Sequence, residues 1–123
     1  MTNDVITPAR VEKRLHELSK EVDAAHVELI ETESKYNRTK AEYEIAMARS
    51  RIGYASKSSP SGKNYTVQER EDMSLIDNAY LHAEMGIVDA QVKAARANTQ
   101  RLKIQVEIAR SIGTSVRTSM DLT

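Results

Sequence analysis

VEKRLHELSKEVDAAHVELIETESKYNRTKAEYEIAMA, residues 11–48, is the stretch that decides the fold. Mostly apolar or small side chains recur in it at alternating steps of three and four, with charged residues between them. A heptad pattern sustained over this length predicts a long helix of the coiled-coil type. Thr7 and Pro8 form a start signal and Gly53 interrupts the pattern, so the helix is expected over residues 8–53. Its seam consists of Val11, Leu15, Leu18, Val22, Ala25, Leu29, Thr32, Tyr36, Thr39, Tyr43 and Ala46.

A second long helix is expected over residues 66–112. Thr66 and Glu69 have the spacing of a capping box, in which each residue satisfies a free amide of the other. Gly113 is expected to end the helix as a left-handed cap, leaving residues 113–123 as a loose tail. The seam of this helix is Met73, Ile76, Tyr80, Ala83, Ile87, Ala90, Ala94, Ala97, Arg101, Ile104 and Ile108.

The two seams predict an all-α fold, a long antiparallel two-helix coiled-coil hairpin that forms one domain over residues 1–123. Folding the chain back about the segment 54–65 places large side chains opposite small ones, as interdigitated packing requires. The large-against-small pairs are Val22 with Ala97, Leu29 with Ala90 and Tyr36 with Ala83. Other expected facing pairs are Val11 with Ile108, Leu15 with Ile104, Tyr43 with Ile76 and, at the bend, Tyr54 with Tyr65. Arg101 then lies opposite Leu18, where a buried or snorkelling cation would fix the register.

Each helix also carries a second apolar line, which a lone hairpin cannot bury. In the second helix this line runs through Val88, Val92, Ala95, Leu102, Val106 and Ala109, and in the first helix through Ala41, Ile45, Ala48 and Ile52. Burial of the second line requires another helix, so hairpins are expected to pair into a homodimeric four-helix bundle. A monomeric hairpin with one wide seam is the alternative.

Composition excludes several classes of function. The chain carries 18 basic and 18 acidic residues, so no overall charge draws it to nucleic acid or to a membrane surface. Cysteine is absent, which removes disulfides, thiolate catalysis and cysteine-ligated metals. His16, His26 and His82 lack metal-ligand spacing, and no catalytic arrangement emerges, so neither an enzyme nor a cofactor is predicted. No secretory or membrane-spanning segment is recognised, and a cytoplasmic location is expected.

The segment RIGYASKSSPSGKNYTVQERE, residues 51–71, resembles a phosphate-binding loop only superficially. Its glycines are wrongly spaced, Asn64 follows Lys63 where Ser or Thr is required, and no strand precedes it, so a nucleotide-hydrolase loop is rejected. A Ser-rich flexible bend is expected instead. Its candidate binding residues are Arg49, Arg51, Tyr54, Lys57, Lys63 and Tyr65, and a second basic face comprises Lys93, Arg96, Arg101 and Lys103.

These patterns favour a non-enzymatic interaction module, namely an adaptor, scaffold or inhibitor that presents a helix face or its tip to another protein. The alternative is binding of nucleic acid or a phosphorylated small molecule, such as a nucleotide, through the basic tip or the 93–103 face. The basic tip also suits a purely structural role beside a helix C-terminus. Small size alone prompts a further hypothesis, that the chain is an accessory protein of a phage or another mobile element.

Overall fold

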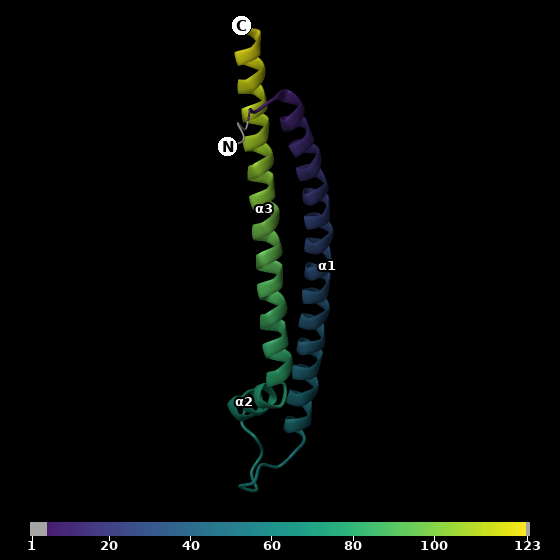
Figure 1. Ribbon diagram of the computed structural model, residues 1–123. Coiled ribbons are helices and arrows are strands. Elements are labelled where there is room, and N and C mark those ends of the chain that lie inside the picture. Colours follow the sequence, from purple (N-terminus) through teal and green to yellow (C-terminus); the bar gives the residue numbers. More distant parts are fainter. Residues whose placement is uncertain (1–4, 123) are drawn as a thin grey trace. The chain divides into compact units, whose positions relative to one another are not determined.

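The computed structural model describes residues 5–122 and contains three helices, α1 (Pro8–Ala55), α2 (Val67–Asp77) and α3 (Ala79–Asp121) (Figure 1). The fold is all-helical, and α1 packs against α3. Two compact units are present. Unit 1 combines the ends of the chain, Met1–Ile30 and Ala94–Thr123, and unit 2 is the central segment Glu31–Lys93. Both α1 and α3 contribute residues to each unit.

Helix α1 follows the sequence prediction closely. Its start uses the predicted signal, since the amide of Arg10 donates to Thr7 Oγ1 at 3.3 Å and the amide of Val11 donates to the Thr7 carbonyl at 3.1 Å. Every predicted seam position from Val11 to Ala46 is buried or half-buried, whereas most residues between these positions are exposed. The heptad pattern of residues 11–48 therefore identified the inward face of α1 correctly.

Unit 1 is an antiparallel pair of helical segments around a small apolar cluster. Leu18 and Ala25 of α1 pack with Leu102 and Ala109 of α3, and Leu18 is only 1% exposed. Leu15, Val22 and Val106 border this cluster. At the rim, Arg14 donates to the side chain of Gln105 at 3.4 Å, and Arg117 lies 3.5 Å from Glu12.

Gly113 has a packing role in unit 1. It is buried within α3, and a Cβ added to it would lie 2.9 Å from Cγ1 of Val11. Glycine thus lets the two helices approach closely at the start of α1. The predicted C-terminal cap at Gly113 and the loose tail 113–123 are both wrong, because α3 continues to Asp121. The helix continues because glycine weakens a helix without ending it when packing compensates.

The inward face of α3 was predicted incorrectly. Of its predicted seam, Ile76, Tyr80, Ile87, Ile104 and Ile108 are all at least 45% exposed. The inward positions instead form the line Ser74, Asn78, Leu81, Met85, Val88, Val92, Ala95, Thr99, Leu102, Val106, Ala109 and Gly113, which begins in α2. This inner line contains no charged residue, whereas the predicted seam would have buried Arg101, and desolvating an unpaired charge costs more than burying threonine or asparagine.

The register shifts with this change of face. Val11 meets Gly113 and not Ile108, and in unit 2 Tyr43 meets His82 and not Ile76, with ring centroids 5.5 Å apart. Arg101 is exposed, and its guanidinium donates to Asn98 Oδ1 at 2.9 Å, so its predicted seam position opposite Leu18 is also wrong. Of the expected pairs, Tyr54 with Tyr65 is confirmed, with ring centroids 5.1 Å apart.

Unit 2 buries Met47, Val88 and Val92, together with several polar side chains. Thr39 is 8% exposed, and its hydroxyl donates to the carbonyl of Lys35 at 2.9 Å. A hydroxyl that is satisfied within its own helix can line an inward face without an unpaired polar atom.

The tip loop, residues 56–66, is a closed turn. The amide of Ser59 donates to the carbonyl of Lys63 at 2.7 Å, and the amide of Gly62 donates to the carbonyl of Ser59 at 2.9 Å. Gly62 has a φ of 82°, a conformation that glycine adopts without steric cost. Thr66 and Glu69 then form the predicted capping box, in which each side chain accepts from the other residue's amide at 3.1 Å.

Candidate interaction surfaces

An apolar line faces outward on the α3 segment of each unit. In unit 2 it contains Tyr80 and Ile87, which are 70% and 55% exposed, and in unit 1 it contains Ile104 and Ile108, which are 45% and 53% exposed. The small residues between them are exposed as well. We call Tyr80, Ala83, Ile87, Ala90, Ala94, Ala97, Ile104 and Ile108 the outward line.

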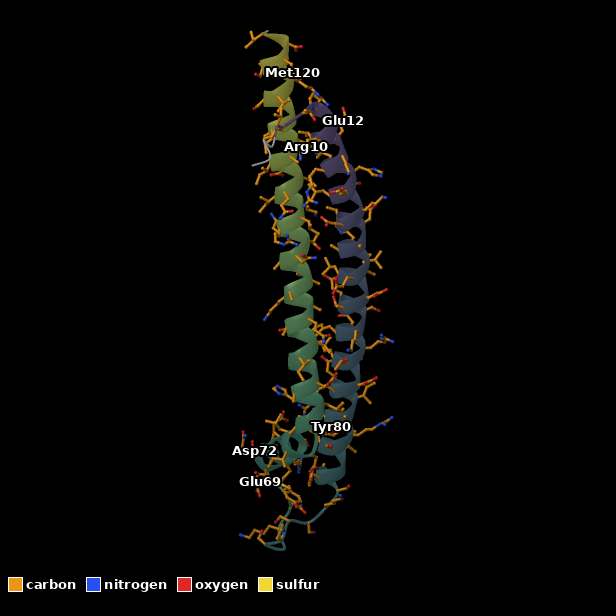
Figure 2. The ribbon with its side chains drawn as sticks, in the orientation of Figure 1. Arg10, Glu12, Glu69, Asp72, Tyr80 and Met120 are labelled. Carbon is orange, nitrogen blue, oxygen red and sulfur yellow. The ribbon has the colours of Figure 1, made fainter. Side chains whose placement is uncertain are left out.

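The charge along the chain differs between the segments that carry the outward line. Residues 69–89, in unit 2, contain Glu69, Glu71, Asp72, Asp77, Glu84 and Asp89 against the single cation Arg70. Figure 2 shows Glu69 and Asp72 on α2. Residues 94–106, in unit 1, contain Arg96, Arg101 and Lys103 and no acid. Four of these six acids lie on α2, so on α3 the outward line is accompanied by the acids Glu84 and Asp89 in unit 2 and by three cations in unit 1.

The line predicted for association lies inside the units. Val88, Val92, Ala95 and Leu102 are at most 6% exposed, and Val106 is half-buried. Packing within the chain thus occupies the surface that the sequence had assigned to a second copy, because this line is the charge-free one. The shorter line of α1 contains Ile45 and Ile52, which are 53% and 72% exposed.

Two polar contacts hold α2 against the end of α1 in unit 2. The guanidinium of Arg51 donates to both carboxylate oxygens of Glu71 at 2.7 Å. This contact raises the pKa of Arg51 and lowers the pKa of Glu71. The hydroxyl of Tyr54 donates to Asp77, and this hydrogen bond raises the pKa of Tyr54. All these side chains are on the surface, where such contacts contribute little to stability.

The predicted tip residues are brought together only in part. The rings of Tyr54 and Tyr65 meet edge to face, and Lys57 Nζ lies 5.5 Å from the centroid of Tyr54. Arg51 is occupied by Glu71, whereas Arg49 and Lys63 have exposed side chains. The tip thus combines two tyrosines in edge-to-face contact, a cation over the ring of one of them and two exposed cations.

The second basic set is distributed over both units. Lys93, in unit 2, forms an ion pair with Asp89 at 2.9 Å. In unit 1, Arg96, Arg101 and Lys103 are exposed along α3. The ion pair of Lys93 reduces the positive charge that this segment presents.

A buried polar cluster at the junction of α2 and α3 was not recognised from the sequence. The side-chain amide nitrogen of Asn78, Nδ2, donates to Ser50 Oγ and to the Ser74 carbonyl, both at 2.9 Å, and lies 3.8 Å from Met47 Sδ. Ser74 is fully buried, and its hydroxyl has no hydrogen-bond partner. An unpaired buried hydroxyl costs about 1–3 kcal/mol. The missed signal is Asp77-Asn78, two poor helix formers in succession inside an otherwise regular pattern.

Unit 1 also has an open, mostly apolar groove of about 740 Å³ at its terminal end. The groove lies between the segment before α1 and the last turns of α3, where Met120 is labelled in Figure 2. A smaller groove of about 290 Å³ shares Ile6 and Ile112 with it. The larger groove is lined by Val5, Ile6, Thr7, Pro8, Ser111, Ile112, Ser115, Val116, Ser119 and Met120.

Comparison of the chain with known protein families, with curated proteins and with solved structures finds no match. Within residues 5–122, no helix combines the length and the apolar character that crossing a membrane requires. Over the same described range, no group of three or more His, Asp or Glu side chains is arranged to hold a metal ion.

Proposed function

We propose that this chain is a non-enzymatic protein-binding module that self-associates through the outward line of α3. The observation that carries the proposal is the exposure of four large apolar side chains, Tyr80, Ile87, Ile104 and Ile108, on the side of α3 away from its inner line. Single exposed apolar residues are ordinary, but a line of them at heptad spacing is the pattern by which helices associate.

Charge complementarity favours a second copy of the chain as the occupant. On α3 itself, Glu84 and Asp89 of one copy can face Arg96 and Arg101 of another, and the reverse match arises at the same time if the two α3 helices run antiparallel. Such an isologous arrangement satisfies both segments, whereas a parallel arrangement places like charges together. The assembled hairpins then form a scaffold, adaptor or inhibitor that leaves the tips free for another protein.

Sedimentation velocity over a concentration series tests this proposal. The parent chain is expected to dimerise, and an Ile87→Glu, Ile104→Glu double variant is expected to stay monomeric with unchanged helical content. Val27→Glu is the matched control, because Val27 is 56% exposed on α1 and lies outside the outward line. A parent that remains monomeric contradicts the proposal, as does loss of association in the Val27→Glu variant alone.

The tip supports a second candidate function, binding of phosphate groups in nucleic acid or in a phosphorylated small molecule. No acid lies between Glu44 and Glu69, and Arg49 and Lys63 are exposed there. Phosphate contacts make affinity fall steeply with salt. A labelled single-stranded oligonucleotide should then bind the parent at low salt and fail to bind a Lys57→Glu, Lys63→Glu variant. Binding that survives in this variant but is lost on Arg96→Glu, Lys103→Glu would assign the phosphate site to the other basic face.

A further inference from the structure

The junction between α2 and α3 is a single residue. The sequence predicts one uninterrupted helix from Thr66, yet the structure interrupts it at Asn78, whose φ and ψ of −113° and 19° are not helical. The carbonyl of Asn78 accepts from the amides of Leu81 and His82, which starts α3. Figure 1 shows α2 turned across the direction of α3 and not continuing it.

The outer side of α2 has little apolar anchoring. Of the four large apolar residues of α2, Val67, Leu75 and Ile76 are 79%, 44% and 67% exposed, and Met73 is half-buried. Two links between α2 and α1 are polar and lie at the surface, one from Arg51 to Glu71 and the other from Tyr54 to Asp77. Segments with few buried apolar contacts and exposed polar contacts are those that open locally at low cost.

The inner side of α2 carries a buried hydroxyl without a hydrogen-bond partner. Ser74 is the most buried residue of the helix, and its hydroxyl lacks a partner. Asn78 maintains the break through its bonds to Ser50 and to the Ser74 carbonyl. The observed position of α2 therefore combines weak outer contacts with an unpaired buried hydroxyl on its inner side. The free-energy difference between this position and an alternative one is accordingly small.

We infer that α2 is a detachable latch, and that its released form continues α3 as one helix through Asn78. In that form Met73 and Ile76 fall in the same heptad series as Tyr80 and Ile87, and they extend the outward line by two positions. Release of α2 thereby controls the length of the docking surface, an inference that rests on the proposed function. The loop between Ala55 and Val67 can follow, because eleven residues span up to about 36 Å and α2 is about 16 Å long.

The test is an intrachain distance measured by double electron–electron resonance. The absence of native cysteine allows two spin labels to be placed cleanly, through Gln68→Cys on α2 and Glu84→Cys on α3. In a continuous helix these positions lie about 24 Å apart along the axis, and the break shortens that distance. Dilution with unlabelled protein separates this distance from any distance between copies.

Two sets of changes should shift the distance to about 24 Å. Asn78→Leu removes the side chain that maintains the break, and the Arg51→Gln, Tyr54→Phe double variant removes only surface contacts, so it remains informative if Asn78→Leu does not fold. Asn37→Leu, at an exposed position of α1, is the control and should leave the distance unchanged. A short distance unchanged in all variants overturns the latch. A shift without any gain in self-association retains the latch and overturns its link to the proposed function.

Discussion

Replacing Leu102 and Ile108 separately by alanine measures which face of α3 lies inward. Leu102 is 4% exposed and packs in the apolar cluster of unit 1, whereas Ile108 is 53% exposed. Leu102→Ala removes three buried carbons, worth about 2.4 kcal/mol in transfer free energy. The cavity left behind raises the expected loss to about 3–4 kcal/mol. Ile108→Ala removes a half-exposed side chain and improves helix propensity, so its expected cost is below about 1 kcal/mol.

Urea unfolding followed by circular dichroism gives both free energies. Unchanged slopes of the free energy against urea concentration would show that both variants unfold from comparable folded states. The measurement belongs at low protein concentration, where self-association through Ile108 contributes least. A larger loss for Ile108→Ala than for Leu102→Ala would refute the reasoning, because it would place the predicted seam, and not the inner line, against α1.

Further predictions concern two glycines, a helix cap and two titrating groups. Gly113→Ala should destabilise unit 1, because the added Cβ would lie 2.9 Å from Cγ1 of Val11. Gly86→Ala should stabilise α3 by about 1 kcal/mol, because nothing lies within 4 Å of the added Cβ. Thermal melts measure both effects, and equal effects would contradict the close approach of Gly113 to Val11. Thr66→Ala should cost about 0.5–2 kcal/mol and slightly reduce helical circular dichroism, because it removes the capping box of α2. The contact with Arg51 lowers the pKa of Glu71, so the stabilisation from this contact is present above pH 4.5 and disappears as the pH falls through the lowered pKa. The difference in unfolding free energy between the parent and Arg51→Gln should therefore vanish in acid. The hydrogen bond to Asp77 raises the pKa of Tyr54, so its stabilisation is present below pH 10.0 and is lost as the pH rises through the raised value. Tyr54→Phe should therefore remove from a spectroscopic titration one tyrosine that ionises above pH 10.0.

The sequence predicted the start and the inward face of α1, which continues two residues past the expected end at Gly53, whereas it predicted α2 and α3 only as one helix over residues 66–112. In α1 one heptad line is far more apolar than any other, so its inward face is unambiguous. In α3 two apolar lines are candidates for the inward face, and the line with more isoleucine also contains Arg101. The absence of charge in the line from Val88 to Gly113, more than its total hydrophobicity, identifies the inward face.

The junction at Asn78 was less predictable. Its capping role depends on Ser50 and Met47, which are distant in sequence and adjacent only after folding. Similarly, Gly113 reads as a helix stop when taken alone, and its place inside α3 becomes evident only when Val11 approaches it. Tertiary contacts override local propensity at both residues.

Disulfide formation tests the pairing of α1 with α3 most directly. A Cβ built at Gly113 lies 3.9 Å from Cβ of Val11, within the range that a disulfide requires, and the chain has no cysteine to interfere. The Val11→Cys, Gly113→Cys double variant should oxidise rapidly to an intrachain bond, detected at monomer mass, whereas the Val11→Cys, Ile108→Cys variant should not. Preferential intrachain closure of the second variant would contradict the account, because it would show that the isoleucine line of α3 faces α1.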